Sequence, residues 1–147
     1  MGRDNLVHLS VLRHLRPASV TQIGKRAAKA INEAVRVRAI RILNLLRAST
    51  NALRKTRIDD ACFNHAKLHA KSTTHVPFTL AQWDRFIREF FGSAYQLGHD
   101  TTVRVVCIIR DFVTELLVAA AEYMLVGQER RITEKHVQYP ILQSSTY

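Results

Sequence analysis

The stretch Thr101–Thr133, TTVRVVCIIRDFVTELLVAAAEYMLVGQERRIT, decides the fold. Its first part, Val103–Val126, contains no Gly or Pro and is apolar on almost every side, as in a helix buried between partners. Gly127 is expected to end this helix, and Thr133 to cap another after the basic loop ERRIT. Charges interrupt the apolar run repeatedly, and each would be costly at membrane depth, so we expect a buried central helix and no membrane partner.

Shorter helices are predicted on both sides of this stretch. Leu80–Gly92 has apolar residues at helical spacing, and the loop SAYQLGHD separates it from the N-caps Asp100–Thr102 of the long helix. The helix after Thr133 is expected to be cut short by Pro140. The predicted core aromatic and aliphatic residues of the first short helix are Trp83, Phe86, Ile87, Phe90 and Phe91.

The same order of elements occurs earlier in the chain. A short helix over Asp4–Arg16 ends at Pro17, and a long helix over Lys25–Leu53 follows. The basic loop RKTR then precedes a short helix over Asp59–Ala70, which Asp59 or Asp60 can cap. The long helix has a broad apolar face and, opposite it, a narrow basic stripe. The apolar face consists of Ala27, Ile31, Ala34, Val35, Ile42, Leu45 and Leu46. The basic stripe consists of Lys25, Lys29, Arg36 and Arg47.

The charge of the chain is concentrated in its first half. The net charge is +10; residues 1–75 hold 15 Lys/Arg against 4 Asp/Glu, and residues 76–147 hold 7 against 8. This predicts a surface for a polyanion mainly on the first half. Two cysteines, Cys62 and Cys107, are too few for a disulfide framework and favour a reducing compartment. The first residues lack the apolar core of a signal peptide, and no lipid anchor is expected.

The chain resembles the core histones in four stretches of its sequence. RFIRE (Arg85–Glu89) and the ungapped run from Thr101 to RIT (Arg131–Thr133) are similar to histone three. SVLRHLRPASVTQI (Ser10–Ile23) and RKT (Arg54–Thr56) are similar to histone four. The order, four then three, is that of the fused histone doublets of some large DNA viruses.

The resemblance implies an all-α fold, in which two tandem histone folds pair as an intramolecular handshake dimer. The first would be 4–70, similar to histone four, and the second 78–142, similar to histone three, with a linker over 71–77. It also implies a protein that wraps and compacts DNA in nucleosome-like particles without sequence specificity. Its location would then be a nucleus or chromosome, or a virion or viral factory. No enzyme and no cofactor are expected.

The implied partners are double-stranded DNA and other histones or histone doublets. Wrapping needs cations spaced to meet phosphates rather than groups that read bases. A second copy of the chain would bind through the second repeat, at Leu125, Val126, Ile141 and Leu142. The residues expected at DNA are Arg13, Arg16, Lys25, Arg26, Lys29, Arg54, Lys55, Thr56, Arg57, Arg85, Arg88, Arg130, Arg131 and Thr133.

Several positions depart from the histone pattern. Gln22, and Gly98 or His99 in the second repeat, stand where the family places an arginine that enters the minor groove. Gln128 replaces the histidine that joins two copies of histone three, and Pro140 falls inside the last helix. The clamp between a second-loop arginine and an acid of the last helix is not evident, and modifiable tails are not expected.

Other interpretations remain open. The chain could be a histone-fold interaction module of a transcription or chromosome-segregation complex, a pairing of the other two core histones, or a plain helical bundle. Cys62, His65 and His69 share one helical face, so with His75 or a residue of another chain they could hold zinc. A nucleophilic role for Cys62 lacks an orienting acid and an oxyanion loop.

Overall fold

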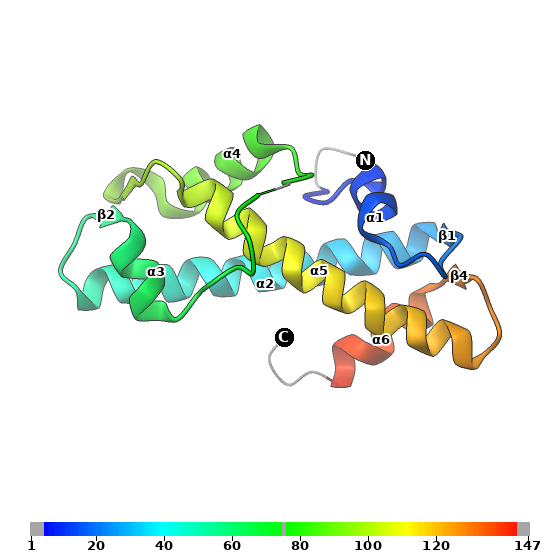
Figure 1. Ribbon diagram of the computed structural model, residues 1–147. Coiled ribbons are helices and arrows are strands. Elements are labelled where there is room, and N and C mark those ends of the chain that lie inside the picture. The colour runs from blue at the N-terminus through cyan, green and yellow to red at the C-terminus, as the bar shows by residue number, and fades with distance from the viewer. Residues whose placement is uncertain (1–4, 75, 144–147) are drawn as a thin grey trace. The chain divides into compact units, whose positions relative to one another are not determined.

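The computed structural model describes residues 5–74 and 76–143, so Asp4 and His75 lie outside the described residues. The fold is mostly helical, and the order helix, strand, long helix, strand, helix occurs twice (Figure 1). The first series consists of α1 (Leu9–Leu15), β1 (Gln22–Ile23), α2 (Lys25–Ala52), β2 (Arg57–Ile58) and α3 (Asp60–Ala66). The second consists of α4 (Leu80–Phe91), the 3-10 turn η2 (Gly92–Ala94), β3 (Gln96–Leu97), α5 (Thr101–Val126), β4 (Arg131–Ile132) and α6 (Glu134–Gln143).

The two series have the same spacing. From β1 to β3 the numbering advances from 22 to 96, and from β2 to β4 from 57 to 131, which is 74 positions in both cases. Two residues with positive φ at the ends of the long helices, Arg54 (φ 56°) and Gln128 (φ 58°), are separated by the same interval. A residue therefore has a defined counterpart 74 positions away.

Strand pairing joins the two series. β1 pairs in parallel with β4, with Gln22 opposite Arg131, and β2 pairs in parallel with β3, with Arg57 opposite Gln96. Each pair thus combines the strand before the long helix of one series with the strand after the long helix of the other. The fold is mostly helical, as expected, but these four strands of two residues were not predicted from the sequence.

The chain divides into two compact units, and each contains segments of both series. The first unit is Met1–Val37 with Asp111–Tyr147, and the second is Arg38–Arg110. Both long helices, α2 and α5, contribute one part to each unit. The division into consecutive repeats, 4–70 and 78–142, stays a prediction.

The core of the first unit is built on the beginning of α2 and the end of α5. Their buried side chains recur three or four residues apart, the spacing that places them on one helical face. Asn32 joins this core to the segment before α1: its Oδ1 accepts the N–H of Val7 at 2.9 Å, and its Nδ2 donates to the carbonyl of Val7 at 2.9 Å. Large members include Leu12, Ile31, Phe112, Leu116, Leu117 and Met124.

The core of the second unit contains the aromatic residues of α4. Trp83 and Ile87 are fully buried, and Phe91 is nearly so, which confirms three of the five core predictions. Phe86 and Phe90 are only half-buried. Trp83 makes edge contacts with Phe78 and Phe86, at centroid distances of 6.0 Å in both cases. The other large members include Ile42, Leu43, Leu46, Ile58, Phe63 and Ile109.

Several predicted helix ends are wrong. α1 begins at Leu9 rather than near Asp4, and α3 ends at Ala66 rather than Ala70, because Lys67 adopts the left-handed conformation (φ 58°). Pro140 does not terminate α6, which continues to Gln143. A proline removes one main-chain hydrogen bond from a helix. Near the end of α6 the loss of this one bond does not end the helix, which continues for three more residues.

The ends of the long helices share one motif. After α2, the N–H groups of Arg54 and Lys55 donate to the carbonyls of Asn51 and Thr50. After α5, the N–H groups of Gln128 and Glu129 bind the corresponding carbonyls in the same way. This is the Schellman pattern, whose left-handed residue is usually glycine. α5 ends at Val126, directly before Gly127 as expected, but the left-handed residue is Gln128 rather than the glycine.

Two predictions for the faces of α2 are also wrong. Leu45, placed on the apolar face, is 39% exposed. Arg47, placed on the basic stripe, is half-buried. It donates to the carbonyl of Phe90 at 3.3 Å, and its guanidinium lies 4.4 Å from the centroid of the Phe90 ring.

Within the described residues, no helix combines the length and apolarity needed to cross a bilayer.

Removing the Asn32 bridge should destabilise the protein. Asn32→Ala leaves the N–H and C=O of Val7 buried without these partners, so we expect the free energy of unfolding to fall by about 1–3 kcal/mol in denaturant titration. The control is Asn44→Ala, at an exposed asparagine of the same helix. Equal stabilities of the two variants would show that the bridge contributes nothing.

Gly98 should tolerate no side chain. A Cβ there would lie 2.7 Å from the carbonyl oxygen of Ile58, which accepts the N–H of Gly98. We expect Gly98→Ala to cost about 1–3 kcal/mol, because backbone has to shift. In Gly127→Ala the new Cβ meets at 3.0 Å only the end of the Glu129 side chain, so that variant should unfold like the wild type. An unchanged midpoint for Gly98→Ala would contradict the β2–β3 geometry.

Candidate nucleic-acid interface

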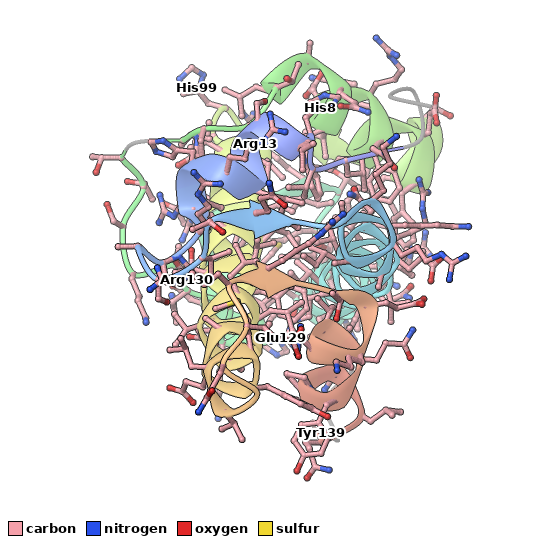
Figure 2. The ribbon with its side chains drawn as sticks, turned by 90° about the vertical axis from the view of Figure 1, so that its right-hand side faces the viewer. His8, Arg13, His99, Glu129, Arg130 and Tyr139 are labelled. Atoms are coloured by element: carbon pink, nitrogen blue, oxygen red, sulfur yellow. The ribbon has the colours of Figure 1, made fainter. Side chains whose placement is uncertain are left out.

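The β1–β4 site comprises residues 22–30 and 128–135, which lie within the first unit. The loop that enters β4 is fixed by Thr21, whose N–H and Oγ1 both donate to the carbonyl of Arg130 at 2.9 Å. Gly24 donates its N–H to the carbonyl of Ile132 at 2.9 Å. Figure 2 shows the two strands side by side, with Arg130 on the loop that leads into β4. These bonds hold the start of α2 against the basic loop of the second series.

Six of the residues predicted at DNA belong to this site, and five of them are cations. Lys25, Arg26 and Lys29 are exposed in the first turns of α2, and Arg130 and Arg131 are exposed at β4. Among the described residues, no acid forms an ion pair with any of them. The site has six cations and two acids in total. It is the main concentration of unpaired positive charge in the first unit.

The β2–β3 site is its counterpart in the second unit and comprises residues 54–61 and 96–104. Thr56 accepts the N–H of Gln96 through its carbonyl at 2.8 Å, and its side chain is exposed. Thr101, which was expected to cap α5, is buried and donates its hydroxyl to the carbonyl of Ile58 at 3.0 Å. Arg54 and Arg57 are exposed, as a DNA-contacting role requires.

The other cations of the β2–β3 site are paired with acids. Lys55 Nζ lies 2.9 Å from Asp59 Oδ2, and Arg104 pairs with Asp60. The hydrogen bond from Lys55 lowers the pKa of Asp59, and the same bond raises the pKa of Lys55. Both groups therefore stay charged at neutral pH, and they neutralise each other. Asp59 occupies the N-cap position of α3, but its carboxylate makes no cap hydrogen bond, contrary to the sequence-based expectation.

The predicted cations of the first short helices belong to different units. Arg13 of α1 is exposed (Figure 2), and Arg16, the residue after α1, donates to the carbonyl of Thr21 at 2.9 Å. On α4, Arg85 is exposed, and Arg88 donates to Asp84 at 2.8 Å. The hydrogen bond from Arg88 lowers the pKa of Asp84. Of these four arginines, Arg13 and Arg85 make no bond within the described residues.

Thr133 has a structural partner. Its N–H and its hydroxyl lie 2.9 and 3.0 Å from Nδ1 of His136, which is 1% exposed. A side chain three residues into a helix that binds the N-cap N–H is one half of a capping box. Because Nδ1 accepts, the ring proton is assigned to Nε2, which faces Glu129 Oε1 at 3.6 Å. His136 thereby fixes the start of α6 beside β4.

The residues predicted for self-association are on the surface of the first unit. Leu125, Val126 and Leu142 are 50%, 85% and 79% exposed, and Ile141 is half-buried. Beside them a groove of about 720 Å³ lies between α5 and α6, lined in part by Tyr123 and by Tyr139, which is labelled in Figure 2.

The proposed zinc face does not form. His69 lies beyond the end of α3, so it cannot share a helical face with Cys62 and His65. Cys62 is buried beside Thr50, and His65 Nδ1 lies 2.8 Å from Ser49 Oγ. The described residues contain no group of three side chains that is suited to a metal ion.

Sequence reasoning missed some residues of the interface. The structural counterpart of Gln22 is Gln96, rather than Gly98 or His99, and each of the two glutamines lies opposite an arginine of the paired strand. Thr21 and Lys135 were not singled out. Aligning the chain with itself at an interval of 74 residues would have revealed these correspondences.

The fold is shared with a known protein. No protein-family model matches the chain, and no curated protein matches it in sequence. Among solved structures it is similar to the histone from Methanopyrus kandleri, with a TM-score of 0.71 and 15% identity. The match covers 92% of this chain and 93% of that chain, so it extends over both series of elements. The chain therefore has a histone fold.

Proposed function

We propose that this protein is a histone-like structural protein that binds double-stranded DNA without sequence specificity and wraps it. The observation that carries the proposal is the joining of each basic loop to the start of a long helix by parallel strands. In the β1–β4 site this brings exposed cations of both series together with the N-terminus of α2. Such groups bind the DNA backbone and leave the bases unread.

We further propose that the two series, 4–70 and 78–142, are two histone folds that pair within the chain as a handshake dimer. The exchanged strand pairs and the interval of 74 residues support this arrangement. So does the extent of the match to the Methanopyrus kandleri histone. The expected partners are DNA and other histone-fold chains. The expected location is a chromosome or nucleoid, and the finer expectation is a nucleus, a virion or a viral factory.

The second candidate function is a histone-fold interaction module that touches DNA only incidentally. The ion pairs of the β2–β3 site favour it, since they remove charge from residues predicted at DNA. So does Gln22, which stands where the resemblance places an arginine, and so does its structural counterpart Gln96. The surplus of positive charge over residues 1–75 favours the DNA-wrapping protein.

Binding should depend steeply on salt and little on sequence. Each neutralised phosphate releases counterions, so affinity should fall by about one power of salt concentration per contact. The measurement is fluorescence anisotropy over a salt series with two duplexes of equal length and unrelated sequence. The two duplexes should give equal slopes and affinities.

Micrococcal nuclease digestion separates the two candidate functions. A DNA-wrapping protein on random-sequence DNA should leave discrete protected lengths, with or without added histones. A smear under both conditions, or a sharp sequence preference at physiological salt, would support the interaction module instead.

Self-association through the second series gives a separate test. If a second copy covers the exposed leucine at the end of α6, Leu142→Glu should reduce the mass measured by light scattering to that of one chain, because a carboxylate would be buried in the joint. Leu80→Glu, at an exposed leucine of α4, is the control and should leave the mass unchanged. A wild type that is already a single chain, or an unchanged mass for Leu142→Glu, would contradict this interface.

A further inference from the structure

Each unit has a pocket beside its pair of strands. The first, in the β1–β4 site, has a volume of about 530 Å³ and includes Gly24 and Arg131 in its lining. The second, in the β2–β3 site, has a volume of about 260 Å³ and includes the counterparts Gly98 and Arg57. Every residue that lines the second pocket is 74 positions away from a residue that lines the first. The two are therefore versions of one pocket and can be compared residue by residue.

The residues that line the two pockets have net charges of opposite sign. The lining of the first contains four cations, Lys25, Arg26, Arg131 and Lys135, and one acid, Glu134. The lining of the second contains one cation, Arg57, and three acids, Asp59, Asp60 and Asp100. The counterpart of Lys25 is His99, and that of Arg26 is Asp100.

The helix starts differ in the same direction. The residue before α2 is Gly24, whose carbonyl accepts the N–H of Ala28, and the first turn of α2 contains no acid. The residue before α5 is Asp100, whose carbonyl accepts the N–H of Arg104. The N-terminus of a helix carries a partial positive charge. The residue that precedes α5 carries a carboxylate, whereas the residue that precedes α2 is a glycine, and neither helix has an acid in its first turn.

Ion pairing leaves the second site fewer free cations than the first. In the β2–β3 site, Lys55 and Arg104 are neutralised by Asp59 and Asp60. In the β1–β4 site, the pair between Glu129 and Lys135 has an N···O distance of 3.4 Å, and Lys135 is 62% exposed, so this pair is weak. The guanidinium of Arg131 lies over Gly24, with Nε 3.5 Å from the point where a Cβ would stand. Glycine thus leaves room for an arginine at the helix start.

We propose that the two pockets are functionally unequal: the pocket of the β1–β4 site receives a phosphate of the DNA backbone, and that of the β2–β3 site does not. The inference rests on the proposed DNA binding and assigns it chiefly to one unit. A phosphate in the first pocket meets cations and free helix N–H groups. In the second it would meet the carboxylate of Asp100, whereas Asp59 and Asp60 already occupy the cations Lys55 and Arg104 that could otherwise bind it.

The test compares equal charge changes at the two sites. Lys25→His/Arg26→Asp gives the first site the residues of its counterpart, and Arg54→His/Arg57→Asp changes the charge of the second by the same amount. We expect the first variant to lower the magnitude of the salt slope by about 1–2. The second variant should lower it by less than half as much. Circular dichroism and thermal unfolding check that both variants are folded.

The reciprocal exchange tests the second pocket by gain of binding. His99→Lys/Asp100→Arg gives it the residues of the first, and it should bind DNA more tightly, with a salt slope larger by about 1. Tighter binding cannot result from a damaged fold, so this test is free of that ambiguity.

The possible results distinguish failure of the inequality between the pockets from failure of the proposed DNA binding. Equal losses at the two sites, or no gain from the exchange, would overturn the inequality while leaving DNA binding in place. A wild-type protein without salt-dependent affinity for duplex DNA would overturn the proposed function and the inequality with it.

Discussion

Parallel pairing between two-residue strands is the constraint on which the rest of the structure depends. Each pair ties the segment before one long helix to the segment after the other. Glycine is required next to the β2–β3 pair, because a Cβ at Gly98 would meet the carbonyl of Ile58 at 2.7 Å. The same bonds bring the start of α2 to Arg130 and Arg131. Packing and charge placement both follow from them.

The same framework carries different chemistry in the two units. Backbone geometry is repeated at an interval of 74 residues, down to the left-handed residues Arg54 and Gln128. The side chains are not repeated: Thr133 is held by His136, whereas its counterpart Asp59 pairs with Lys55. Strand pairing depends on main-chain groups and a few buried residues, so the exposed side chains can differ between the two units without disturbing it. A shared fold therefore does not imply equal binding surfaces.

The long helices could be predicted from sequence because their apolar residues recur with helical periodicity over many turns, as on α2 from Ala27 to Leu46. The strands could not, since two residues carry no periodic pattern. Pro140 was misjudged because a proline near a helix end costs little. Arg47 was misjudged because an arginine can pack its guanidinium on an aromatic ring, as it does on Phe90. The candidate cations were recognised, but their pairing with acids depends on tertiary contacts such as that of Arg104 with Asp60.

The measurement that tests the central claim most directly is the linking number of closed circular DNA relaxed by a topoisomerase in the presence of the protein. Wrapping constrains DNA in superhelical turns, whereas binding along a straight duplex does not. The account predicts a linking-number change that grows with the amount of bound protein until the DNA is covered. An unchanged linking number on DNA saturated with protein would contradict wrapping, even if the affinity is high.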